Sequence, residues 1–123
     1  MGFFSSSKIK FPWLDLTSSE QLNQIIQESN EHPVLLFKHS TRCSISSMAK
    51  SRFESNWKLT NDVCPTYYLD LIALRPISAE IADITGVEHQ SPQAIVVKDG
   101  KVIYHASHSG IDAQEIEKLI VND

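Results

Sequence analysis

The sequence is short of cysteine, glycine and positive charge. Its 123 residues include two cysteines and four glycines, and 15 acidic against 11 basic residues give a formal charge of -4. Without a basic excess, we expect no nucleic-acid partner. Two cysteines do not make a disulfide scaffold, and there is neither a secretory signal pattern nor an apolar run of roughly 20 residues that would cross a bilayer. We therefore expect a cytoplasmic protein with no membrane partner.

The length indicates one domain over residues 1–123, large enough to bury a core without crosslinks. Residues 1–10 are expected to form a flexible, mostly polar tail. Beyond them, apolar periodicity and turn residues predict the order α-β-α-β-α-β-β-α. The helices are expected at about 18–31, 44–57, 75–85 and 112–121, and the strands at 34–38, 66–73, 93–98 and 101–106.

Helical spacing of apolar residues predicts which faces are buried, and Asp99-Gly100 is typical of a tight turn that joins the last two strands as a hairpin. A helix between the first two strands implies that they are parallel. The apolar positions expected in the core are Ile45, Met48, Ala49, Phe53 and Trp57 in the second helix, Ile77, Ile81 and Ile84 in the third, and Ile116, Leu119 and Ile120 in the last.

Cys43 lies between a short apolar run and a helical pattern, which places one thiol at a strand-to-helix junction. Backbone amides without intrahelical partners, together with the helix dipole, favour the thiolate at such a position. Arg42 adds a full positive charge. We expect Cys43 to be a nucleophile whose thiolate is stabilised by Thr41, Arg42 and Ser46; the alternative is an inert buried cysteine.

The spacing Cys43-x-x-Ser46 provides one thiol where dithiol enzymes have two. Ser46 cannot attack sulfur, so another molecule must release a mixed disulfide on Cys43. Ser46 either donates a hydrogen bond to the thiolate or satisfies the first helical turn. Cys64 follows a helix that carries the chain on the order of 20 Å away from Cys43, whereas a disulfide needs Cα atoms within roughly 7 Å. We expect Cys64 to be partly buried and inert.

Several segments resemble the YtxJ family of monothiol bacilliredoxin-like proteins over roughly residues 17–121. They are Phe37-Lys38-His39-Ser40-Thr41-Arg42-Cys43-Ser44-Ile45-Ser46, Tyr68-Leu69-Asp70-Leu71, Ser91-Pro92-Gln93 and Gly100-Lys101-Val102-Ile103-Tyr104-His105-Ala106-Ser107-His108. Ser44 departs from the family's proline, and Phe37 stands where thioredoxins carry a buried acid. The resemblance implies a thioredoxin-like α/β fold with a central mixed four-stranded sheet flanked by helices, and a cis peptide bond before Pro92. An ordinary trans proline at the start of a strand is the alternative.

In such a sheet the third strand begins where the first ends, so four segments should converge on Cys43. We expect substrate to contact Ser91, Pro92, Lys38, Arg75, His108 and Gly110, with the basic side chains holding carboxylates of a small thiol. Solvated surface charge is the alternative for these side chains. Scattered histidines without a close pair of ligands predict no metal site.

The leading hypothesis is a monothiol thiol-disulfide oxidoreductase that removes a low-molecular-weight thiol from client mixed disulfides through Cys43. The resemblance implies bacillithiol as the co-substrate, with no tightly bound cofactor. The expected partners are S-thiolated client proteins and a separate thiol reductant. Two alternatives are a non-catalytic, redox-responsive binding module and a glutaredoxin-like iron-sulfur carrier, whose usual Cys-Gly-Phe-Ser loop differs from Cys43-Ser44-Ile45-Ser46.

Overall fold

The computed structural model describes residues 11–121, so the tail expected at residues 1–10 lies outside the described residues. The described part alternates helices and strands in the expected order, with one additional short strand at its start and one short 3-10 helix. Its strands are β2 (Leu14–Asp15), β3 (Val34–His39), β4 (Thr66–Asp70), β5 (Gln93–Lys98) and β6 (Lys101–Ser107). Its helices are α1 (Ser19–Glu28), α2 (Ser44–Asn56), α3 (Arg75–Thr85), η1 (His108–Gly110) and α4 (Ala113–Val121).

The strands form one mixed sheet in the order β2-β4-β3-β5-β6. β3 and β4 are parallel, as a connecting helix requires, whereas β5 runs antiparallel to both β3 and β6. The parallel pair and the hairpin are therefore confirmed. Cys43 follows β3, the middle strand of the sheet, so the end of this strand is flanked by β4 and β5.

The sheet has five strands rather than the expected four, because β2 adds to the free edge of β4. Leu14 pairs with Tyr67, and Asp15 pairs with Tyr68, in parallel register. The Trp13 ring packs against Phe37 and Phe53 at centroid distances of 5.3 and 5.7 Å. The pairing of β2 with β4 is therefore accompanied by aromatic packing of the preceding residue, Trp13. A strand of two residues is too short to show an alternating apolar pattern in the sequence.

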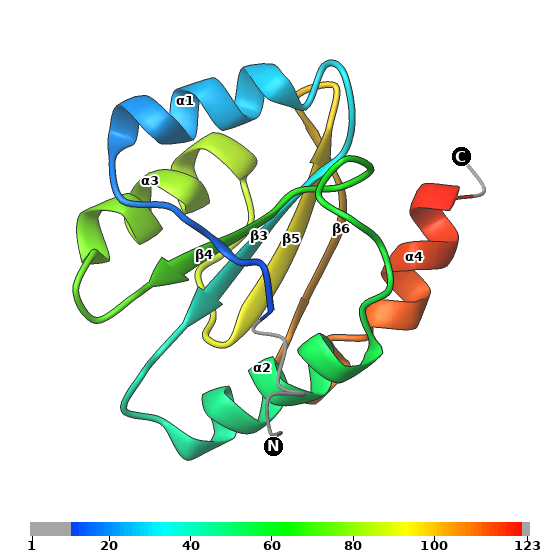
Figure 1. Ribbon diagram of the computed structural model, residues 1–123. Helices are drawn as coiled ribbons and strands as arrows, with labels where there is room; N and C mark the ends of the chain where they lie inside the picture. The colour runs from blue at the N-terminus through cyan, green and yellow to red at the C-terminus, as the bar shows by residue number, and fades with distance from the viewer. Residues whose placement is uncertain (1–10, 122–123) are drawn as a thin grey trace, which may run out of the picture.

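Helices cover both faces of the sheet, α1 and α3 on one side and α2 and α4 on the other (Figure 1). Each face has its own apolar cluster. The first includes Leu22, Ile25, Leu36, Ile77, Ile81 and Ile95, and the second includes Leu35, Phe37, Phe53, Cys64, Val96 and Ile116. Alternate residues of β3 therefore enter opposite layers, as the pleat of a strand dictates.

The buried face of α2 differs from the expected apolar stripe. Ile45 and Met48 are 60% and 69% exposed, whereas Ser46, Ala49 and Phe53 are buried. Ser46, Ala49 and Phe53 follow the i, i+3, i+7 spacing of one helix face, which leaves Ile45 and Met48 on neighbouring faces. Apolar spacing alone does not predict which face of α2 is buried, because one residue of the inward face is the polar Ser46.

Two further helix positions were also expected in the core and are exposed. Ile84, near the end of α3, is 44% exposed, and Leu119 in α4 is 40% exposed. Both lie in the last turns of short helices. The core contacts of α3 come from Ile77 and Ile81, and those of α4 come mainly from Ile116.

The local signals at the element ends explain where the chain turns. Ser18 caps α1, since its Oγ accepts from the Gln21 backbone N–H at 3.1 Å. β4 ends at Asp70 rather than at residue 73, because the Asp70 carboxylate accepts from the N–H groups of Ile72 and Ala73 and forms a turn. The hairpin turn has positive φ at both central residues, 55° at Asp99 and 74° at Gly100.

Candidate active site

Strand register brings the predicted site segments to one edge of the sheet. Gln93 pairs with both Lys38 and Ser107, so the end of β3, the start of β5 and the end of β6 lie side by side. The Ser91–Pro92 peptide bond is cis, as expected. The His108 backbone N–H donates to the Pro92 carbonyl at 3.0 Å, which joins η1 to the loop before β5.

Cys43 is the N-cap residue of α2 and is partly exposed. Its backbone N–H donates to the Ser40 carbonyl at 3.1 Å, and its carbonyl accepts from the Ser47 N–H at 3.0 Å. The sulfur therefore belongs to the residue that joins a tight turn to the first turn of a helix, next to amides that favour negative charge. Thr41 and Arg42 form the exposed part of this turn.

Ser46 is fully buried and bonds to the turn before Cys43. Its Oγ accepts from the Ser40 N–H at 3.1 Å and lies 2.7 Å from Nδ1 of His39. The Cys43 side chain makes no capping hydrogen bond. Of the two expected roles of Ser46, the structure shows hydrogen bonding near the helix start rather than a bond to the sulfur.

Sequence reasoning placed His39 near Cys43 only as one of several scattered histidines and assigned it no role at the site. It is 6% exposed, and its ring lies 5.8 Å from that of Tyr68. Burial lowers the pKa of His39, the charge of Lys50 lowers it further, and Asp70 and Glu54 act in the opposite direction. The imidazole is therefore neutral at neutral pH.

Lys38 does not fit its expected role in binding a substrate carboxylate. Its side chain is fully buried, and its Nζ donates to the Ser78 carbonyl at 3.2 Å. The same atom lies 3.2 Å from Nδ1 of His89. Because β3 side chains alternate, Lys38 faces α3 while His39 faces α2. Burial lowers the pKa of Lys38 to about 8.

The buried amine predicts a distinctive pH dependence of stability. The pKa of Lys38 falls from 10.5 to about 8 on folding, so the unfolded chain binds more protons between these values and unfolding becomes harder as pH rises. Between pH 8 and 9.5 the wild type should gain on the order of 1–2 kcal/mol relative to Lys38→Met. Urea unfolding of both proteins measures the difference, in which contributions from Cys64 and the tyrosines cancel. Parallel stability curves would contradict this prediction.

Among the other predicted substrate residues, Ser91 is half-buried and Pro92 is buried, whereas the remaining three lie on the surface. Arg75 is exposed at the start of α3, and both His108 and Gly110 are exposed in η1. Arg52 is a residue that sequence reasoning missed; its guanidinium donates to the His108 carbonyl at 3.3 Å. No sequence motif marked Arg52, because the contact bridges two segments that are distant in the chain.

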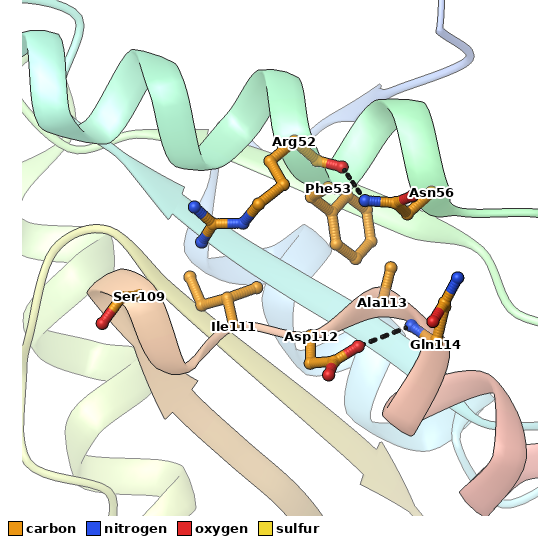
Figure 2. A pocket seen from close by; sticks show the side chains of 8 residues that line it. All are labelled: Arg52, Phe53, Asn56, Ser109, Ile111, Asp112, Ala113 and Gln114. Atoms are coloured by element: carbon orange, nitrogen blue, oxygen red, sulfur yellow. Dashed lines mark hydrogen bonds between the residues drawn. The ribbon is translucent and has the colours of Figure 1, made fainter.

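A pocket of about 280 Å³ opens between α2 and the segment from η1 to α4. Figure 2 shows Arg52 and Phe53 on the α2 side, with Ser109 and Ile111 across from them. Asp112 lies at the start of α4, and its carboxylate accepts from the Gln114 and Glu115 N–H groups. The Asp112 carboxylate is therefore already the hydrogen-bond acceptor of these two N–H groups at the start of α4.

Cys64 is buried in the apolar layer beneath α2, and burial raises the pKa of its thiol to about 12. Both cysteines are free. The Cys64 thiol is therefore protonated at neutral pH, and it is fully enclosed by core side chains rather than partly buried as expected.

Within residues 11–121, no three His, Cys, Asp or Glu side chains group as they would around a metal ion. No helix in the same range is long and apolar enough to span a membrane.

Comparisons with known proteins match this geometry. The profile of the monothiol bacilliredoxin BrxC matches residues 14–116. A solved thioredoxin-fold protein regarded as an oxidoreductase is 31% identical, with a TM-score of 0.73 over 85% of this chain and 90% of that chain. The thioredoxin of Malassezia sympodialis is 18% identical, with a TM-score of 0.68 over 92% and 91%. That of Trypanosoma brucei brucei is 16% identical, with a TM-score of 0.67 over 94% and 97%. The latter two show the fold.

Proposed function

Because this chain belongs to the monothiol bacilliredoxin family and is a thiol-disulfide oxidoreductase, we propose that Cys43 removes bacillithiol from mixed disulfides on client proteins. The observation that supports this most directly is the pairing of a partly exposed Cys43 at the α2 N-terminus with a serine three residues later. The other cysteine, Cys64, is enclosed in the core. Cys43 is therefore the one thiol that takes part in the exchange.

The reaction has two exchanges. In the first, the Cys43 thiolate attacks the bacillithiol sulfur of the mixed disulfide, the client sulfur leaves as a thiolate, and this thiolate takes a proton from solvent. Cys43 is then joined to bacillithiol. In the second, a separate thiol reductant attacks this new disulfide and returns Cys43 to the thiolate. Ser46 cannot perform the second step, because an oxygen does not replace the resolving sulfur.

Residues around the edge of the sheet near Cys43 orient the substrate. The Ser91 backbone lies beside the start of β5 and pairs with an extended segment of the client. Arg42 and Arg75 are exposed and basic, so they attract the carboxylates of the small thiol. Lys38 has no part in this binding, because its ammonium is buried against Ser78. The proposal also places the reaction in a reducing cytoplasm, where the Cys43 thiol stays free.

A transfer assay tests this function. A client protein carrying one bacillithiol mixed disulfide is incubated with the reduced chain, and intact mass follows both proteins. We expect the client to lose bacillithiol while the chain gains one bacillithiol adduct on Cys43. With excess free bacillithiol as reductant, one molecule should regenerate many client molecules.

A matched client that carries glutathione measures which small thiol is preferred. Faster removal of bacillithiol supports the proposal, whereas equal or faster removal of glutathione would show a different small-thiol specificity. A chain that accepts one adduct and never releases a client thiol over many equivalents would instead be a redox-responsive binding module.

A further inference from the structure

The Cys43 turn is connected to a buried histidine through a continuous chain of hydrogen bonds. The Ser40 carbonyl accepts from the Cys43 N–H, and the Ser40 N–H donates to Ser46 Oγ. Ser46 Oγ in turn lies 2.7 Å from His39 Nδ1, and this distance is shorter than those of the other two hydrogen bonds in the series. Ser46 thus fixes both the start of the turn and the helix that begins at its end.

His39 and Ser46 come from different elements, β3 and α2, and meet away from solvent. His39 is 6% exposed and Ser46 is fully buried. Without the imidazole, the Ser46 hydroxyl would lose its only side-chain partner within residues 11–121, because its other bond there is to the Ser40 backbone. A buried hydroxyl with one partner missing changes rotamer readily, and the Ser40 N–H would then lose its acceptor.

The surroundings of His39 keep its ring neutral and in place. From α2 it faces Lys50 and Glu54, and from β4 it faces Tyr68 and Asp70. Lys50 and Glu54 pair with each other at 2.7 Å. Neutral imidazole exchanges one hydrogen bond with the Ser46 hydroxyl in either tautomer, so the contact does not require a charged ring.

We propose that His39 is a positioning residue for Cys43 that acts through Ser46: the imidazole orients the Ser46 hydroxyl, and this hydroxyl holds the Ser40–Cys43 turn, and with it the sulfur, at the start of α2. The inference rests on the proposed nucleophilic role of Cys43. It assigns no proton transfer to His39. His39 Nδ1 contacts the Ser46 hydroxyl rather than the reacting sulfur.

A double-mutant cycle tests the route through Ser46. The four proteins are the wild type, His39→Phe, Ser46→Ala and the double variant. The measurement is the rate of Cys43 alkylation by iodoacetamide from pH 5 to 10, with intact mass confirming one adduct per chain. His39→Phe should slow alkylation about fivefold at pH 7 and move the half-maximal rate to higher pH, since the turn that carries the sulfur is then held less firmly at the α2 N-terminus. In the Ser46→Ala background, the same substitution should change little.

Conservative variants separate positioning from folding. His39→Asn places an amide where Nδ1 lies, so it should restore most of the alkylation rate, whereas His39→Gln sets its amide further out and should not. If His39→Phe fails to fold, this pair replaces it in the cycle. Urea unfolding of each variant shows how much stability is lost.

The outcomes are decisive. The proposal is overturned if His39→Phe alkylates with the wild-type pH profile, or if it slows alkylation equally in both Ser46 backgrounds. A loss of stability with an unchanged profile would likewise show a purely structural histidine. The bacillithiol transfer assay is separate: it can fail for want of the right client or small thiol while the alkylation cycle still gives its result.

Discussion

Cys43→Ser is expected to abolish thiol transfer, lowering the turnover rate by about three orders of magnitude or more. A serine hydroxyl is not ionised at neutral pH and cannot form a disulfide, so no part of the first exchange remains. The fold should be unaffected, because Cys43 is partly exposed and its side chain makes no capping hydrogen bond. The measurement is multiple-turnover release of client thiol.

Cys64→Ala is the matched control for this prediction. It removes the other thiol of the chain without burying a hydroxyl in the apolar layer, which Cys64→Ser would do. We expect turnover within about twofold of the wild type and a loss of roughly 1 kcal/mol in stability. Comparable loss of turnover in both variants would contradict a one-thiol mechanism.

Phe53→Ala is expected to destabilise the fold by about 3–5 kcal/mol. Phe53 is 2% exposed and anchors the helix that carries Cys43 to the sheet. Its ring contacts Phe37 and Trp57 at centroid distances of 5.5 and 5.0 Å, and Trp13 stacks on it from β2's side. Truncation leaves a cavity among rigid aromatic rings that cannot easily collapse. Urea unfolding measures the effect.

Met48→Ala, on the same helix, is the control. Met48 is 69% exposed, so its truncation should change stability by no more than about 0.5 kcal/mol. The two substitutions would have similar effects if α2 buried the apolar stripe that spacing alone predicts. A large loss for Met48→Ala would therefore favour that stripe over the observed helix orientation.

Most of the fold was predictable because local signals and global topology agree. Asp99-Gly100 forms the tight turn that its residue types predict. β2 was not predictable, since it is two residues long and is accompanied by contacts of Trp13 with rings from β3 and α2. The inward face of α2 was misassigned because burial of Ser46 depends on hydrogen bonds that no apolar pattern encodes.

The site was predictable in its sequence-local part. Cys43 lies at the junction that its flanking patterns indicated, and the Ser91–Pro92 bond is cis as the resemblance implied. The tertiary contacts could not be foreseen: neighbouring residues Lys38 and His39 point to opposite layers, one towards Ser78 and the other towards Ser46. Lys38 is therefore close to Cys43 in the sequence but is not available at the surface to bind a substrate carboxylate.

The enclosure of Cys64 in the core has a consequence for oxidative damage. When peroxide converts Cys43 to a sulfenic acid, no neighbouring sulfur of the chain is available to condense with it. Two reactions of the Cys43 sulfenic acid then compete. One is condensation with a small thiol, and the other is further oxidation to the sulfinic acid, which ordinary thiols do not reverse. We therefore expect the protection of Cys43 against peroxide to depend on the concentration of a small thiol.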